Sequence, residues 1–277
     1  MSAESPRDVT TTGPPAGRGR VRVSIRELSK TFVAGGREVA AVSHVSFDVH
    51  EQEFVAIVGP SGCGKSTILN MIGGLLPVSD GAILVDGARV GATPPPRVGY
   101  VFQKDTVFPW RTVEQNIALG LEYRGVPAAA RTARVREAIR VAGLEGFEDA
   151  FPATLSGGMR QRVALMRSLI VDPEVLLMDE PFGALDTHTK LGLHAELLSL
   201  WEAKHQTVVF VTHDLSEAIT LADRIVVMTR RPGRIKLVYD VLLPRPRDVI
   251  ALRESREYLR EYGEIWHALG AELEVRA

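Results

Sequence analysis

The chain contains a single cysteine, Cys63, among its 277 residues. One thiol cannot form a disulfide within the chain, so no internal cross-link contributes to its stability. A lone cysteine suits a compartment that keeps thiols reduced better than it suits a secreted disulfide scaffold. We therefore expect the protein to reside in the cytoplasm.

The chain also lacks a long apolar run and an excess of charge of one sign. A helix that crosses a membrane needs about 18 or more apolar residues, and no stretch of that length occurs. The N-terminus has no apolar segment behind its charges, so we expect neither a spanning helix nor a secretion signal. The 33 basic and 34 acidic side chains give a net charge of -1, which disfavours nucleic acid as a partner because no overall field attracts a polyanion.

The chain does have a clear succession of patterns along its length. Residues 1–20 lack apolar periodicity, which predicts a disordered tail. From Val21 short β-type runs follow, and later buried strands alternate with helices, which is typical of parallel strands flanked by helices. Between about 112 and 170 the apolar period becomes helical, which predicts an inserted α-helical subdomain. Apolar residues near helical spacing over 248–270 predict an amphipathic helix within a C-terminal extension, 244–277.

A glycine-rich segment lies between the apolar run Phe54–Val58 and a helical pattern. Its form is G-x-x-x-x-G-K-[ST], in which glycines let backbone N–H groups curl around phosphates and the next helix adds the positive end of its dipole. Lys65 is expected to reach the β- and γ-phosphates, and Ser66 to ligate Mg²⁺. The predicted nucleotide-binding residues are Gly59, Pro60, Ser61, Gly62, Cys63, Gly64, Lys65, Ser66 and Thr67.

This segment predicts the fold class and one reactive site. The fold class is α/β, a P-loop NTPase core with a mixed, mainly parallel sheet, an N-terminal antiparallel β layer and the inserted α-helical subdomain. Because Cys63 falls within the loop, its thiol is expected to lie beside the phosphates, where modification would block hydrolysis.

Acidic and histidine side chains end two further apolar strands. The run Val175–Met178 leads into Asp179 and Glu180, and parallel sheets present ligand-binding groups at the carboxyl ends of their strands. Asp179 is predicted to hold Mg²⁺ through water, and Glu180 to orient or deprotonate a water molecule. His213 follows the strand Val208–Val211 and is predicted to sense the γ-phosphate, with a purely structural role as the alternative.

A second anion site is predicted where Ser156, Gly157 and Gly158 open a helix. Helix-start amides together with a capping hydroxyl bind anions. One γ-phosphate does not need two cradles, so this site could serve a nucleotide held by another subunit. With the segment Leu155–Arg162 the sequence resembles the ATP-binding cassette (ABC) ATPases, whose motifs occur in order from about residue 21 to 240 and define an ABC ATPase domain over 21–243.

The resemblance implies roles for further residues. In that family an aromatic residue ahead of the phosphate loop stacks on adenine, and Phe32 occupies its place, with core packing as the alternative. Gln103 matches the glutamine that contacts Mg²⁺ and the attacking water. Asp186 matches the loop that crosses the dimer interface, although Gly183 stands where the family usually has serine. The implied cofactors are ATP and Mg²⁺, and the implied catalytic residues are Glu180, His213, Lys65 and Gln103.

The same resemblance implies partners. Two copies would close head to tail as a homodimer, with Ser156, Gly157 and Gly158 of one completing the ATP site of the other. The loop 103–112 exposes Phe108 and Trp110, which are expected to dock on a transmembrane permease; burial of both rings in the helical subdomain is the alternative.

Three loops are similar to those of the nitrate/sulfonate/taurine branch of ABC importers, namely 103–112, 212–218 and 231–235. This similarity implies an extracytoplasmic solute-binding protein as an indirect partner and a peripheral location on the cytoplasmic face of the inner membrane. The predicted function is ATP hydrolysis that drives uptake of a small solute, such as the anions nitrate, taurine or an alkanesulfonate.

Two other functions are weighed against transport. A soluble ABC ATPase that acts on nucleic acid or ribosomes generally carries a long coiled-coil insertion or a second cassette. Here only a compact insert separates Gln103 from Leu155, and the chain has one phosphate loop. A P-loop kinase for a small molecule would lack the segment Leu155–Arg162.

Overall fold

The structure is a computed structural model that describes residues 19–273 except 92, 105 and 184. Residues 1–18 of the predicted tail, and 274–277 of the predicted C-terminal extension, lie outside the described residues. None of the described helices is both long and apolar enough to cross a membrane.

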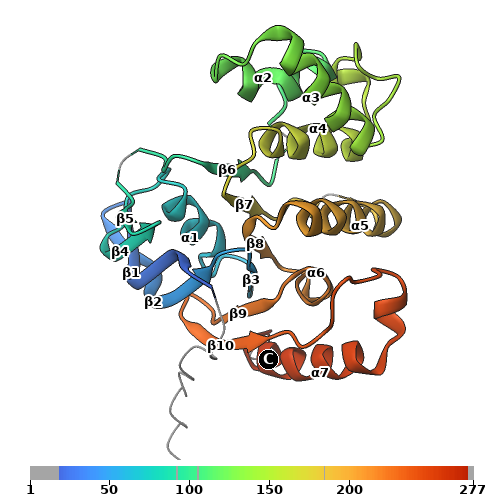
Figure 1. Ribbon diagram of the computed structural model, residues 1–277. Coiled ribbons are helices and arrows are strands. Elements are labelled where there is room, and N and C mark those ends of the chain that lie inside the picture. Colours follow the sequence, from blue (N-terminus) through green and yellow to red (C-terminus); the bar gives the residue numbers. More distant parts are fainter. Residues whose placement is uncertain (1–18, 92, 105, 184, 274–277) are drawn as a thin grey trace, which may run out of the picture.

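A six-stranded sheet forms the centre of the molecule, in the order β10-β9-β3-β8-β7-β6 (Figure 1). All neighbours pair in parallel except β10, which is antiparallel to β9. Strands β3, β7, β8 and β9 are buried along their whole length, which explains their continuous apolar sequences. The bounds are β3 Phe54–Val58, β6 Val98–Val101, β7 Val175–Asp179, β8 Thr207–Thr212, β9 Arg224–Met228 and β10 Ile235–Asp240.

A four-stranded antiparallel sheet from the N-terminal part of the chain has the order β2-β1-β4-β5. Its first hairpin turns at Gly35 and Gly36, whose φ angles of 56° and 75° suit glycine. Strand β1 begins at Val21, as predicted, and register shifts after Ile25 and Leu28 let its second half keep pairing with β2. The bounds are β1 Val21–Ala34, β2 Arg37–His50, β4 Asp80–Val85 and β5 Ala88–Arg89.

Successive residues of β3 face opposite sides of the sheet and build two cores. Val55 and Ile57 join the apolar cluster of helix α1 (Lys65–Ile72) and the antiparallel sheet. Phe54, Ala56 and Val58 join a larger cluster with the remaining helices. In Figure 1, α1 lies between the two sheets, and α5, α6 and α7 lie on the other side of the central sheet. Their bounds are α5 Thr187–Lys204, α6 Leu215–Leu221 and α7 Arg256–Leu273, with a 3₁₀ turn at Ala251–Glu254.

The predicted helical insert consists of α2 (Val113–Tyr123), α3 (Ala128–Val141) and α4 (Gly157–Leu169), which form the upper part of Figure 1. A short 3₁₀ turn, Pro152–Thr154, precedes α4. Thr112 caps α2 in a capping box with Gln115, each side chain bonding the other's backbone N–H. The insert leaves the sheet after β6 and returns before β7, and so the predicted α/β fold class is confirmed.

Candidate nucleotide-binding site

The glycine-rich segment forms a tight loop between the end of β3 and the start of α1. Gly62 and Gly64 have φ angles of 76° and 103°, which L side chains rarely adopt. A Cβ on Gly64 would lie 2.6 Å from Cγ2 of Val42 in β2, so a side chain has no space there. The loop therefore curls against the antiparallel sheet, with α1 starting directly behind it.

A second loop, between β9 and β10, braces the phosphate loop. A Cβ on Gly233 would lie 2.0 Å from the carbonyl oxygen of Cys63, so only glycine permits this approach. Gly233 N donates to Ala41 O at 2.9 Å, and Ser43 N donates to Gly233 O at 3.0 Å. The resemblance to importer loops covers residues 231–235 but does not predict this brace, for which the Pro232-Gly233 pair is the local signal.

Lys65 and Cys63 face opposite ways from the loop. Lys65 is 5% exposed, and its Nζ donates to Gly59 O at 2.9 Å and to Pro60 O at 3.2 Å, which keeps the ammonium within the curl of the loop. The Cys63 side chain is buried in the core cluster with Ile57 and Met228, and burial raises the pKa of its thiol. The expectation of an accessible thiol beside the phosphates is therefore wrong, because the side chain packs beneath the loop.

Two of the three predicted metal ligands, Ser66 and Asp179, meet at the start of α1. Ser66 Oγ donates to Asp179 Oδ1 at 2.7 Å, across from the end of β7. Asp179 is 7% exposed, and this burial raises its pKa although the hydrogen bond from Ser66 opposes the shift. Within the described residues, no group of three or more His, Cys, Asp or Glu side chains could hold a metal ion. The hydroxyl–carboxylate pair fits Mg²⁺ only as a partial site, completed by water and phosphate oxygens.

Three predicted catalytic residues meet at one oxygen atom. Oε2 of Glu180 lies 2.9 Å from Nδ1 of His213 and accepts a hydrogen bond from Nε2 of Gln103 at 3.3 Å. These residues follow β7, β8 and β6 respectively, so the carboxyl edge of the central sheet brings them together. Glu180 has a φ angle of 43°, and its N–H donates to Val211 O at 2.9 Å, which fixes this unusual backbone against β8.

The other predicted site residues lie on separate elements. Phe32 is on β1, 39% exposed, with Lys30 Nζ 5.2 Å from its ring centroid, so its face is not part of the core. Ser156 caps α4 by accepting from Met159 N at 3.2 Å, and both Ser156 and Gly157 are exposed. The Asp186 carboxylate accepts from N and Oγ1 of Thr189 at 3.1 and 2.7 Å, in the first turn of α5.

The two aromatic side chains of the loop predicted to dock on a permease differ in exposure. Trp110 is 70% exposed. Phe108 is half-buried, with the Arg167 guanidinium 5.4 Å from its ring centroid, and its N–H donates to Asn116 Oδ1 at 2.7 Å. The ring centroids of Phe108 and Trp110 are 5.3 Å apart. Phe108 therefore anchors the loop on the helical subdomain, and Trp110 remains on the surface.

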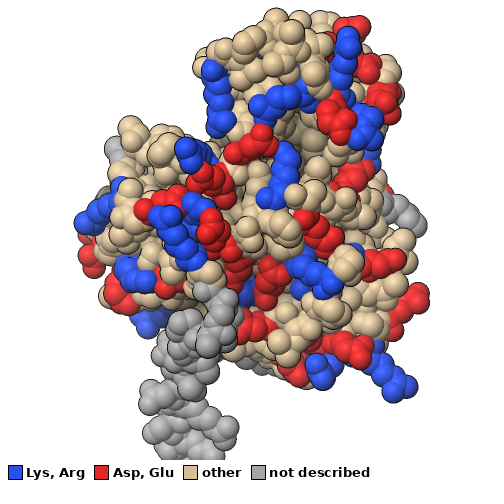
Figure 2. Space-filling view, viewed as in Figure 1, with Lys and Arg blue, Asp and Glu red and all other residues tan. Residues whose placement is uncertain are grey.

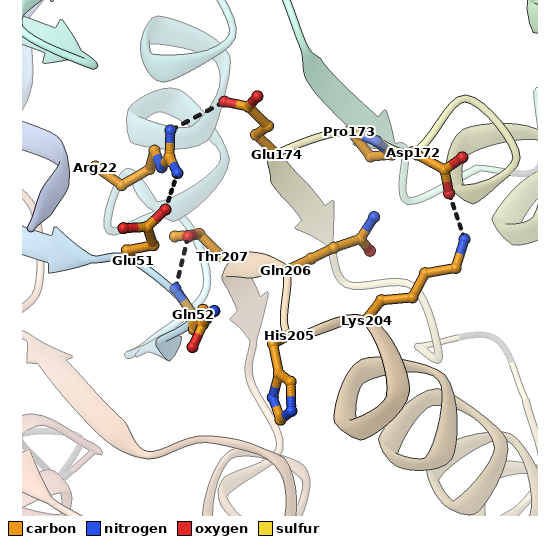
Figure 3. Close-up of a pocket in the computed structure, with 10 residues that line it drawn as sticks. All are labelled: Arg22, Glu51, Gln52, Asp172, Pro173, Glu174, Lys204, His205, Gln206 and Thr207. Carbon is orange, nitrogen blue, oxygen red and sulfur yellow. Dashed lines mark hydrogen bonds and ion pairs between the residues drawn. The ribbon is translucent and has the colours of Figure 1, made fainter. Parts of the chain in front are cut away.

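Another hollow, of about 310 Å³, lies at the opposite edge of the central sheet (Figure 3). Its charged side chains pair with one another: Arg22 donates to both Glu51 and Glu174, and Asp172 binds Lys204. Oγ1 of Thr207, at the amino end of β8, accepts from Gln52 N at 3.1 Å. None of the predicted site residues lines this hollow, so we place the nucleotide site at the phosphate-loop edge alone.

Comparisons with known proteins agree with this geometry. The family model described as ABC transporter matches residues 42–183. An uncharacterized ABC transporter ATP-binding protein of Methanocaldococcus jannaschii is 46% identical over 92% of this chain and 94% of its own length. The aliphatic sulfonates import ATP-binding protein SsuB of Bacillus cereus is 45% identical over 81% of this chain and 88% of its own. The taurine import ATP-binding protein TauB of Rhizobium johnstonii is 49% identical over 74% of this chain and 78% of its own.

A solved structure shares the fold. It is a dimeric ATP-binding cassette in a post-hydrolysis state with ADP and Pi, 32% identical, with a TM-score of 0.72 over 80% of this chain and all of that chain. The phosphate loop, the strand-end carboxylates and the family match lead to one conclusion: the chain belongs to the ABC transporter family, as an ATP-binding subunit.

Proposed function

We propose that this chain hydrolyses ATP to drive the import of an organic sulfonate or taurine through a separate permease. The observation that carries the hydrolytic part is the meeting of Gln103 and His213 at Oε2 of Glu180, behind the Ser66–Asp179 pair. The similarity to sulfonate and taurine import proteins supports the solute class. Nitrate, the third predicted solute, is named by none of the relatives described above.

Each residue has a distinct part in the proposed reaction. The Lys65 ammonium exchanges its loop carbonyl partners for the β- and γ-phosphates. Ser66 and Asp179 would hold Mg²⁺, which supplies charge neutralisation on the phosphate oxygens. Glu180 accepts a hydrogen bond from the attacking water through Oε2 and takes up its proton, while Gln103 and His213 hold that carboxylate in place.

We further propose that ATP closes two copies into a dimer. The exposed Ser156 and Gly157 on the helical subdomain provide helix-start amides that are free to approach the γ-phosphate held by a second copy. The dimeric form of the similar cassette structures supports this arrangement. ADP lacks the γ-phosphate and cannot bridge the two surfaces, so hydrolysis would release the dimer.

The permease contact is proposed at Trp110 and at a groove of the helical subdomain. This groove, about 860 Å³, lies between α3, α4 and α5 and is lined mainly by apolar side chains such as Ala138, Met166 and Leu200. Helix α4 links the groove to the docking loop, because Nη1 of Arg167 in that helix donates to Thr106 O at 2.8 Å. A helix of the permease is the proposed occupant, which places this chain on the cytoplasmic face of the membrane.

Nucleic acid is not favoured as a partner. Figure 2 shows basic and acidic side chains interspersed over the visible face, without a continuous basic surface that would follow a phosphate backbone.

The variant Glu180→Gln tests the proposed function. The amide keeps the shape of the side chain but cannot accept a proton, so ATP turnover is expected to fall at least about a hundredfold while ATP binding persists. Sedimentation should then show a dimer with ATP and a monomer with ADP. Near-normal turnover would remove Glu180 from its role, and a monomer at saturating ATP would contradict the shared site.

A further inference from the structure

The start of α6, directly after His213, departs from an ordinary helix cap. Asp214 is the N-cap and Glu217 the third helical residue, a spacing at which glutamate usually accepts from the N-cap backbone N–H. Here Asp214 N instead donates to Oγ1 of Thr212 at 3.0 Å, and that hydroxyl donates to Oε2 of Glu217 at 2.6 Å. The residues on both sides of His213 are thus held by one hydroxyl group. In α2 of the same chain, the capping box closes in the usual way.

Glu217 is itself fixed from a third element. It is 2% exposed, and its Oε1 forms an ion pair with Nζ of Lys190 at 3.0 Å. Lys190 lies in the first turn of α5, and its N–H donates to Asp186 O at 3.0 Å. A buried carboxylate requires such partners because its desolvation is costly. Chain segments after β7 and β8 are therefore joined beneath the site by Lys190, Glu217 and Thr212.

We propose that Thr212 and Glu217 are positioning residues for His213, and that Lys190 couples their arrangement to the segment around Asp186. The proposal rests on the proposed function, because His213 acts only through its contact with Glu180 at 2.9 Å. The Thr212 hydroxyl holds the N–H of Asp214, which follows His213, and is itself held by Glu217, so it sets where the imidazole projects. An imidazole displaced by about 1 Å would lose that contact, and errors of this size cost roughly a hundredfold in rate.

The test compares two buried threonines at the ends of one strand, in the full chain assembled with its permease. Thr212 is 1% exposed and Thr207 is 2% exposed, and both lie in β8. We expect Thr212→Val to lower kcat about tenfold or more, with the affinity for ATP changed less than about twofold, because the phosphate loop is untouched. Thr212→Ser, which retains the hydroxyl, should restore most of kcat. Thr207→Val should lower the Tm to a similar extent but keep kcat.

A second measurement separates positioning from general destabilisation. In a His213→Ala background, Thr212→Val should cause no further loss of the residual turnover, since the group it positions is absent. The proposal is overturned if Thr212→Val keeps kcat, if Thr207→Val lowers kcat as much, or if the two losses multiply in the double variant. If the wild-type complex does not hydrolyse ATP, the proposed function itself is overturned. If the wild type hydrolyses ATP and Thr212→Val hydrolyses it equally fast, only the positioning role of Thr212 is overturned.

Discussion

Among single residues, burial decides which side chains can titrate. His194 in α5 is fully buried, its ring centroid is 4.7 Å from that of Phe182, and burial lowers its pKa to about 4. The unfolded chain takes up this proton near pH 6.5, whereas the folded protein does not until about pH 4. Between these values the unfolded state binds more protons, so the folded state loses stability as the pH falls.

Replacing His194 should therefore flatten the pH dependence of stability. Between about pH 7.5 and pH 5, the wild type is expected to lose about 2 kcal/mol more of its unfolding free energy than His194→Gln does. Urea unfolding of both proteins at the two pH values measures the difference. The charged neighbours Lys190, Asp214, Glu217 and Arg253 are common to both proteins, so their titration cancels to first order. Equal losses in the two proteins would show that His194 is protonated while folded.

Burial also decides the reactivity of Cys63. Its side chain is 1% exposed and the pKa of its thiol is raised, so a thiol reagent can react with the folded protein only when the core opens. We expect a thiol reagent to label the folded protein at least about a hundredfold more slowly than the unfolded chain. Cys63→Ala should retain ATP turnover within about twofold, as only backbone groups of this residue face the loop interior. Fast labelling of the folded protein that ATP prevents would show that the thiol lies beside the phosphates after all.

Among the structural elements, the docking loop contains one side chain expected to contribute to folding stability and another expected to contribute to permease binding. Phe108 contacts Arg167 and is half-buried, whereas Trp110 is largely exposed. Phe108→Ala is expected to lower the unfolding free energy by about 2 kcal/mol, less than a fully buried ring would cost. Trp110→Ala should change it by less than about 0.5 kcal/mol but weaken permease binding. Urea unfolding and co-purification with the permease measure the two effects, and intact assembly of Trp110→Ala would remove this ring from the interface.

The elements also show what the sequence could predict. Strands β3, β7 and β8 were predictable because buried parallel strands are continuous apolar runs. Strand β10, Ile235–Asp240, was missed because it lies at the sheet edge and none of its residues is fully buried, so its sequence is neither a continuous apolar run nor a regular alternation. The metal-binding roles of Ser66 and Asp179 followed from two local motifs, and the structure joins the two side chains by a hydrogen bond. The brace by Gly233 and the bond from Thr212 to Glu217 depend on tertiary contacts that no local pattern encodes.

In the molecule as a whole, the groove lies where the helical subdomain meets α5. Ala133 of α3 is exposed and lines this groove, while Ala129, one turn earlier in the same helix, is exposed but does not line it. A carboxylate placed in the groove must lose its water when a permease helix fills the apolar space, and the lining cations Arg134 and Lys204 already pair with Asp172. Ala133→Glu is therefore expected to weaken permease binding about tenfold, or about 1.4 kcal/mol, and to reduce transport in proportion.

The same substitution one turn earlier provides the matched control. Ala129→Glu introduces the same charge outside the groove, so it should leave permease binding within about twofold. Basal ATP turnover of the isolated subunit should be unchanged in both variants, because α3 contributes no residue to the nucleotide site. Binding measured by titration of reconstituted permease discriminates between the outcomes. If both variants bind the permease equally well, the occupant of the groove is not the permease; if both bind poorly, charge on this side of α3 matters more than the groove itself.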